Sequence, residues 1–124
     1  MSCIIVDDEP LAREGMKINI DTLENLNLVG SFSNALLANA FLKENTVDLM
    51  FLDINMPHLS GLDFAKSLTQ PPMIIFTTAY PQFALESYDV SAVDYLTKPI
   101  RFQRFFQAVT KAEEKFLLHN PSVN

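Results

Sequence analysis

The strongest constraint on the fold is the stretch Leu49-Met50-Phe51-Leu52, in which four apolar residues lie between Asp48 and Asp53. A short, continuous apolar run is typical of a strand that is covered on both faces, as in a parallel sheet. Asp53 would lie at the carboxyl end of this strand, the edge at which open α/β sheets bind ligands. A carboxylate there can be a nucleophile, a metal ligand or a helix cap, and the rest of the chain must discriminate between these roles.

Similar apolar segments recur along the chain and alternate with segments of helical spacing. We expect strands over Cys3–Val6, Leu26–Phe32, Leu49–Leu52, Met73–Phe76 and Ala92–Leu96. We expect helices over Pro10–Leu23, Asn34–Glu44, Ser60 or Gly61 to Leu68, Pro81–Tyr88 and Phe102–Leu118. The second helix would place on one face Leu37, Ala40 and Phe41. In the last helix, helical spacing is followed by Phe102, Phe105, Phe106, Val109 and Phe116.

This alternation of strands and helices predicts an α/β fold, a parallel sheet with helices on both faces. The common five-stranded version is the flavodoxin-like (βα)5 doubly wound sheet with strand order 2-1-3-4-5. Its strand order reverses between strands 1 and 3, so the ends of these two strands meet at the switch point. The first strand ends at Asp7 and Asp8 and the third at Asp53, so we expect three carboxylates to lie together there.

Composition excludes several classes of function. A chain of 124 residues with 48% hydrophobic residues suggests one domain with a real core. The net charge of -6 argues against direct nucleic-acid binding. The single cysteine, Cys3, cannot form an internal disulfide, and it lies in an apolar run, so we expect a core residue in a reducing compartment. No apolar run exceeds four residues and the acidic start lacks a positive leader, so we expect a cytoplasmic protein with no membrane contact.

The expected carboxylate cluster needs a compensating charge. At about 5 Å and an effective dielectric near 20, each pair of carboxylates costs roughly 3 kcal/mol. A hard divalent cation would offset this, and Mg²⁺ suits a site with few carboxylates and several waters. Neighbouring strand ends would add the hydroxyl of Thr78 and the ammonium of Lys98. A nucleophile, a metal, a cation and a hydroxyl are what phosphoryl transfer to a carboxylate requires.

Each residue also has an ordinary explanation when it is taken alone. Asp7 or Asp8 could cap the first helix, and Asp53 could be a loop or cap residue. Thr78 could be a turn hydroxyl, and Lys98 a solvated charge. The coincidence favours a site, because all four positions fall at carboxyl ends of predicted strands, whereas chance would scatter them over both edges of the sheet.

At these residues the sequence resembles the receiver domain of two-component response regulators, from Ile4 to about Leu118. The resemblance rests on Ile5-Val6-Asp7-Asp8-Glu9-Pro10, Leu52-Asp53-Ile54-Asn55-Met56-Pro57, Ser60-Gly61, Thr78-Ala79 and Tyr95-Leu96-Thr97-Lys98-Pro99. Residues 78–85 and 92–96, with Asp8 to Arg13, are similar to the receivers of LytTR-type (LytR/AlgR) regulators. This similarity implies a receiver over residues 1–118, a linker or disordered tail over 119–124, and a DNA-binding output domain that is absent from this chain.

The resemblance implies a role for each matching residue. Asp53 would be the phosphoacceptor, with Mg²⁺ (or Mn²⁺ in its place) held by Asp8, Asp53 and the backbone carbonyl of Asn55, and by Asp7 through water. Thr78 and Lys98 would contact the phosphoryl group. Tyr95 would be a switch residue whose rotamer follows Thr78, and the Lys98–Pro99 peptide bond would be cis.

The family implies a phosphorelay switch that serves transcription regulation and is not an enzyme acting on external substrates. Its partners would be a sensor histidine kinase, its own output domain and a second copy on phosphorylation, with DNA contacted only through the missing domain. Three alternatives compete: a small metal-dependent phosphatase, a flavodoxin-like cofactor binder and a receiver-like domain that only mediates contacts. The phosphatase lacks room for a cap domain, and the acidic loop after the first strand would repel a cofactor phosphate.

Overall fold

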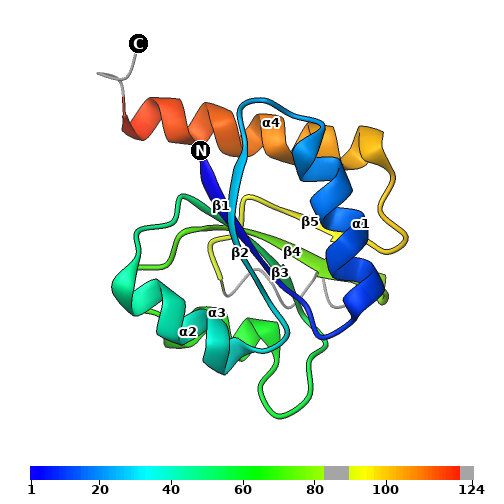
Figure 1. Ribbon diagram of the computed structural model, residues 1–124, viewed down its shortest axis with the longest axis vertical. Coiled ribbons are helices and arrows are strands. Elements are labelled where there is room, and N and C mark those ends of the chain that lie inside the picture. Colours follow the sequence, from blue (N-terminus) through cyan, green and yellow to red (C-terminus); the bar gives the residue numbers. More distant parts are fainter. Residues whose placement is uncertain (83–89, 121–124) are drawn as a thin grey trace.

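The computed structural model describes residues 1–82 and 90–120, and these form five strands and four helices (Figure 1). All five strands are parallel and lie in the order β2-β1-β3-β4-β5, which confirms the predicted fold class and topology. The strands are β1 (Ser2–Val6), β2 (Asn27–Phe32), β3 (Leu49–Asp53), β4 (Met73–Thr78) and β5 (Asp94–Thr97). The helices are α1 (Pro10–Asp21), α2 (Ala35–Glu44), α3 (Gly61–Ser67) and α4 (Phe102–His119).

These bounds agree with the predicted ones to within two residues, and one predicted helix cannot be compared. The helix expected over Pro81–Tyr88 lies mostly outside the described residues, which stop at 82 and resume at 90. The sheet extends further than expected at its carboxyl edge, because Asp53 belongs to β3 and pairs in register with Thr77 of β4. The site residues of these two strands are therefore held by the sheet itself.

The sheet is covered on both faces, with α2 and α3 on one side and α1 and α4 on the other (Figure 1). Alternate residues of one strand serve the two layers, since successive side chains of a strand point to opposite faces. Ile4 and Val6 of β1 pack into the cluster under α2 and α3, whereas Cys3 and Ile5 pack under α1 and α4. This is why β1, β3 and β4 contain unbroken apolar runs. Burial also raises the pKa of the Cys3 thiol to about 12.

Local sequence explains how the helices begin. Pro10 occupies the first turn of α1, where its missing N–H is not needed. The Asn34 side chain caps α2 by accepting the N–H of Leu37 at 2.9 Å. The Ser60 hydroxyl accepts the N–H of Asp63 at 3.1 Å and so caps α3. The start of α3 lies next to the end of β3, so this cap also fixes the loop that follows Asp53.

The residues that the sequence pattern grouped in two helices are buried only in part. In α2, Leu37 and Ala40 are exposed, and the buried residues are Ala35 and Ala38. Small side chains on the inner face let the helix lie close to the sheet. Leu36 and Leu37 turn outward, whereas Phe41 and Leu42 are half-buried and pack against the core.

In α4 the core positions are Phe105, Ala108, Val109 and Ala112. Of the residues that follow helical spacing, Phe105 and Val109 are buried, whereas Phe102 and Phe106 are 41% and 46% exposed. Phe105 stacks on Phe51 of β3 with ring centroids 5.6 Å apart and so anchors the helix to the sheet.

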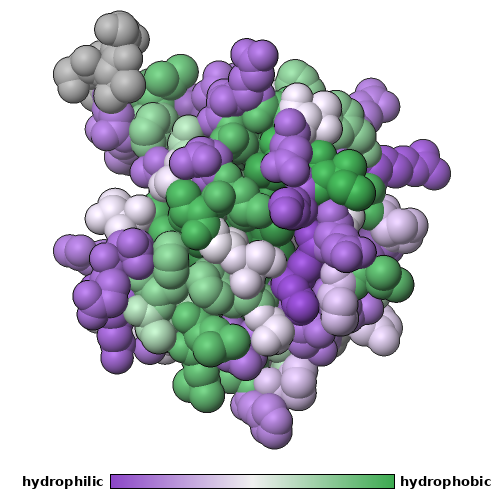
Figure 2. All heavy atoms as spheres, in the orientation of Figure 1, coloured by the Kyte–Doolittle hydropathy of each residue, from purple (hydrophilic) through white to green (hydrophobic). Residues whose placement is uncertain are grey.

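Hydrophobic residues also reach the surface. Figure 2 shows them gathered over the middle of the face on which β1 and β2 lie, with hydrophilic residues around them. Among the described residues, no helix is both long enough and apolar enough to cross a bilayer.

Candidate functional site

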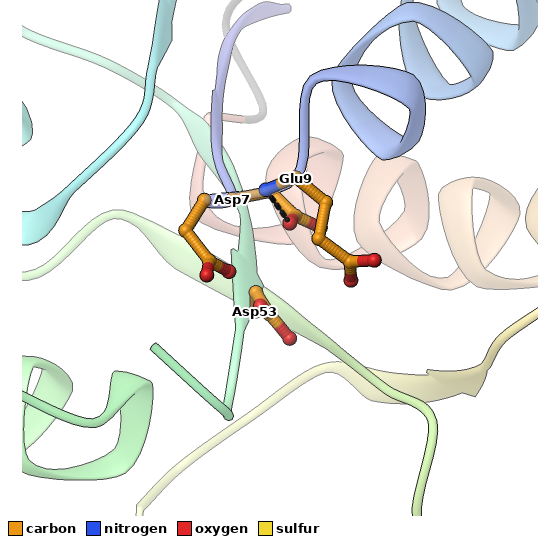
Figure 3. A group of neighbouring side chains, drawn as sticks. Asp7, Glu9 and Asp53 are labelled. Atoms are coloured by element: carbon orange, nitrogen blue, oxygen red, sulfur yellow. Dashed lines mark hydrogen bonds between the residues drawn. The ribbon is translucent and has the colours of Figure 1, made fainter. Parts of the chain in front are cut away.

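The candidate site lies at the carboxyl edge of the sheet, where the topology predicts it. Asp7 and Asp8 follow β1, Asp53 ends β3, and Lys98 follows β5. Asp7, Asp8, Glu9 and Asp53 each offer a carboxylate oxygen, and these four atoms lie within 4.8 Å of one another. Figure 3 shows Asp7 and Glu9 on the turn after β1 facing Asp53 on β3.

The first loop is built around Asp7. Its carboxylate Oδ1 accepts the backbone N–H of Glu9 at 2.9 Å, and its carbonyl accepts the Arg13 guanidinium at 2.7 Å. This contact is a local turn bond rather than a cap of α1, because Glu9 occupies the cap position without a side-chain cap bond. Asp7 is buried, and its two hydrogen bonds, to the Glu9 N–H and to Arg13, hold it in place.

Lys98 joins the carboxylates. Its Nζ lies 2.8 Å from Glu9 Oε1, 2.9 Å from Asp7 Oδ2 and 3.6 Å from Asp53 Oδ1. Burial would lower the pKa of the Lys98 ammonium, but the bonds to Glu9 and Asp7 outweigh this and raise it. The Lys98 bond in turn lowers the pKa of Glu9. The Lys98–Pro99 peptide bond is cis, as expected.

The surroundings of Asp53 disfavour the ionised form of its carboxyl group. Burial and the nearby negative charge of Asp7 raise its pKa to about 7, against the smaller opposing effects of Lys98 and the Asn55 N–H. The Asn55 N–H donates to Asp53 Oδ1 at 3.3 Å. A single ammonium does not neutralise the acids around it, so the site as folded favours a further cation.

The donor set fits a Mg²⁺ ion. All four candidate ligands are carboxylates, the hard oxygen donors that Mg²⁺ prefers. Asp53 and Asp7 are buried, Asp8 is half-buried and Glu9 is exposed. A cation bound by Asp8 and Asp53 would therefore keep part of its shell open to water, as Mg²⁺ usually does.

Thr78 and Asn55 are linked beside the cluster. Thr78 is fully buried, and its hydroxyl donates to Asn55 Oδ1 at 3.0 Å and accepts the N–H of Tyr80 at 3.0 Å. Thr78 thus connects the loop after β3 to the end of β4. Tyr95 lies on β5 in register with Phe76 and is partly exposed. The proposed coupling of the Tyr95 rotamer to Thr78 stays a prediction.

Gly61 lets α3 approach the phosphoacceptor candidate. Its N–H donates to the carbonyl of Ile54 at 2.9 Å. A Cβ at this position would lie 2.1 Å from the carbonyl oxygen of Asp53, so only glycine fits. In the same loop His58 has a φ of 71° and forms a tight turn in which the Leu59 N–H donates to Pro57 O.

Sequence reasoning gave no role to Glu9, although it is the nearest carboxylate to Lys98. The sequence shows Glu9 as the third acid of Asp7-Asp8-Glu9. It does not show that the Glu9 side chain contacts Lys98, which lies 89 positions away. The structure brings Asp7, Asp8, Asp53 and Lys98 together, and hydrogen bonds link Asn55 to Asp53 and Thr78 to Asn55. Within the described part of the chain, no hydrogen bond or ion pair joins the Tyr95 side chain to this group.

Comparison with known proteins gives a consistent answer. Residues 3–110 match the response regulator receiver domain family. The chain is 39% identical over 118 residues to the sensory transduction protein LytR of Staphylococcus haemolyticus, covering 93% of this chain and 46% of that protein. It is 42% identical over 116 residues to the positive alginate biosynthesis regulatory protein of Pseudomonas aeruginosa, covering 90% of this chain and 47% of that protein. The chain therefore spans about half the length of these curated relatives.

A solved structure shares the fold. The response regulatory domain of MrkE from Klebsiella pneumoniae superposes with a TM-score of 0.84 at 36% identity, covering 93% of this chain and 97% of that one.

Proposed function

The chain belongs to the response regulator receiver domain family of two-component systems, and from this premise we propose that it is a switch phosphorylated on Asp53. One observation carries the proposal. The buried carboxylate of Asp53 lies at the end of β3 among three other carboxylates, with the ammonium of Lys98 at 3.6 Å. This arrangement supports a nucleophile whose new phosphoryl charge is met by a metal and a lysine.

The chemistry is an in-line displacement at phosphorus. One oxygen of the Asp53 carboxylate attacks the phosphoryl group of a phosphohistidine. The phosphorus–nitrogen bond breaks, its electron pair stays on the imidazole, which takes up a proton, and an acyl phosphate remains on Asp53. A Mg²⁺ ion held by Asp8, Asp53 and the Asn55 carbonyl, with Asp7 acting through water, would neutralise phosphoryl oxygens.

The remaining residues would hold the product and report it. Lys98 would contact one phosphoryl oxygen. The Thr78 hydroxyl would exchange its bond to Asn55 for a bond to a second phosphoryl oxygen. This movement would shift the loop after β4. A local charge change of this kind biases a two-state element, here the surface that includes β5 with Tyr95 and α4.

The partners follow from the same proposal. A sensor histidine kinase would supply the phosphoryl group. Because the chain matches a little under half of relatives such as LytR, we infer that its signal passes to a LytTR-type DNA-binding domain, and that a second copy binds on phosphorylation. The acidic net charge of -6 is compatible with DNA contact through another domain only.

Acetyl phosphate provides the test. With Mg²⁺, intact-protein mass spectrometry is expected to show a gain of one phosphoryl group. The gain should be lost in Asp53→Asn and after addition of EDTA, and kept in Asp21→Asn, which removes an exposed carboxylate at the end of α1. An unlabelled wild type that still binds Mg²⁺ would favour the contact-only alternative, and steady hydrolysis of many phosphoesters would favour the phosphatase.

A further inference from the structure

Lys98 is bound away from the phosphoacceptor candidate. A lysine ammonium has three N–H donors, and in this structure Glu9 and Asp7 take one each at 2.8 and 2.9 Å. The third carboxylate oxygen, Asp53 Oδ1, lies at 3.6 Å, beyond a normal hydrogen bond. The two nearest partners of Lys98 both belong to the loop after β1, so this loop sets the position of the ammonium.

The two partners differ in how easily they release the ammonium. Asp7 is buried and also accepts the Glu9 N–H, so loss of Lys98 would leave a desolvated charge. The Glu9 side chain is 62% exposed, and water can replace Lys98 around its carboxylate. Lys98 itself is only 16% exposed and needs a partner at all times. When a new acceptor reaches Lys98, Glu9 is therefore the partner that gives way.

Glu9 has no other evident structural task. It makes no side-chain cap bond at the start of α1, and among the described residues its side chain bonds to Lys98 alone. Its carboxylate is nevertheless one of the four that gather at the site.

We propose that Glu9 is a positioning residue that holds the Lys98 ammonium on the solvent side of the site and competes with the phosphoryl group of Asp53 for it. The inference rests on the proposed function and deepens it. Removing the Glu9 charge would free Lys98 to meet a phosphoryl oxygen and so favour the occupied state. Because Glu9 and Lys98 form a partly exposed ion pair, we expect its loss to favour the occupied state by a factor of about two to five.

Beryllofluoride, a phosphoryl mimic, gives an equilibrium test that does not depend on turnover. Its apparent affinity at saturating Mg²⁺ is followed by NMR in wild type and Glu9→Gln, and the acetyl phosphate labelling rate is followed by intact mass. We expect Glu9→Gln to bind the mimic about two- to fivefold more tightly and to label faster by a similar factor, with an unchanged unfolding temperature. Glu14→Gln, which removes an exposed charge from α1, should match wild type in both measurements.

The double variant with Lys98→Ala separates positioning from simple charge repulsion. If Glu9 acts through Lys98, Glu9→Gln has no effect in the Lys98→Ala background, and the labelling rate shows this even where that variant binds the mimic weakly. The inference is overturned if the gain persists there, if Glu14→Gln shows the same gain, or if Glu9→Gln binds the mimic no more tightly. A wild type that neither labels nor binds beryllofluoride would overturn the proposed function as well.

Discussion

At the scale of single residues, Asp94 is a buried acid outside the candidate site. Its carboxylate accepts two bonds from the Arg104 guanidinium, at 2.8 and 2.7 Å, and lies 3.2 Å from Lys111 Nζ. Burial alone would raise the pKa of Asp94, but the bonds from Arg104, the Tyr95 N–H and Lys111 lower it. Arg104 also donates to the Tyr95 carbonyl at 3.1 Å, so this cluster ties β5 to α4.

The Asp94 cluster predicts a pH-dependent contribution to stability. Since folding lowers this pKa below its usual 3.8, the folded state favours the ionised form. Its contribution is therefore complete above about pH 5 and is lost as the pH falls through the folded pKa. Asp94→Asn should lower the free energy of unfolding by about 1–2 kcal/mol at pH 7, because Arg104 and Lys111 are partly exposed and can be resolvated.

Urea unfolding of wild type and Asp94→Asn at several pH values measures this. The difference between them should shrink as the pH approaches 3. Asp21→Asn, at an exposed position, is the control and should stay close to wild type near neutral pH. A difference that is the same at pH 3 and pH 7 would contradict the ionic explanation.

At the scale of elements, two glycines in helices should respond in opposite ways to the same substitution. Gly61→Ala places a Cβ 2.1 Å from the Asp53 carbonyl oxygen and 3.1 Å from Ile54 Cα, so α3 must move away from β3. Gly15 lies in α1 with nothing within 4 Å of an added Cβ. We expect Gly61→Ala to lower the free energy of unfolding by about 2 kcal/mol or more. Gly15→Ala should raise it by about 0.5–1 kcal/mol through helix propensity.

Thermal unfolding of the two variants, with phosphorylation by acetyl phosphate as a second readout, tests the pair. Gly61→Ala should also slow labelling, because the moved backbone carries Asp53. Equal stability of the two variants would mean that the close approach of α3 to β3 relaxes without cost.

Some of the strands and helix faces could be predicted from the sequence. Strands β1, β3 and β4 were predictable because burial on both faces leaves unbroken apolar runs. The inner face of α2 was predictable only in part, because Phe41 packs against the core but Leu37 is exposed, and Ala35 and Ala38 are the buried residues. A large apolar residue favours burial, but which face of a helix turns inward also depends on how close the helix lies to the sheet.

At the scale of the whole molecule, topology made the candidate site predictable. Parallel strands in the order β2-β1-β3-β4-β5 bring Asp7, Asp8 and Asp53 to one edge whatever their side-chain rotamers. The bond that Lys98 donates to Glu9 could not be predicted in this way, because it depends on the rotamers of two long side chains that follow strands remote in sequence. Strand order predicts which residues meet, and the contacts between them need coordinates.

Bringing acids together also gives the fold a predictable response to Mg²⁺. The unfolded chain separates these carboxylates, so Mg²⁺ should bind the folded state almost exclusively and raise its stability by about 1.4 kcal/mol at tenfold excess over the dissociation constant. For a domain of this size the unfolding temperature should rise by about 5 °C. Asp53→Asn should be more stable than wild type without Mg²⁺, because the buried charge is gone, and should gain much less on its addition. Calorimetry at ionic strength matched with NaCl measures both effects, and Glu44→Gln is the control. An equal gain in Asp53→Asn would place the cation elsewhere.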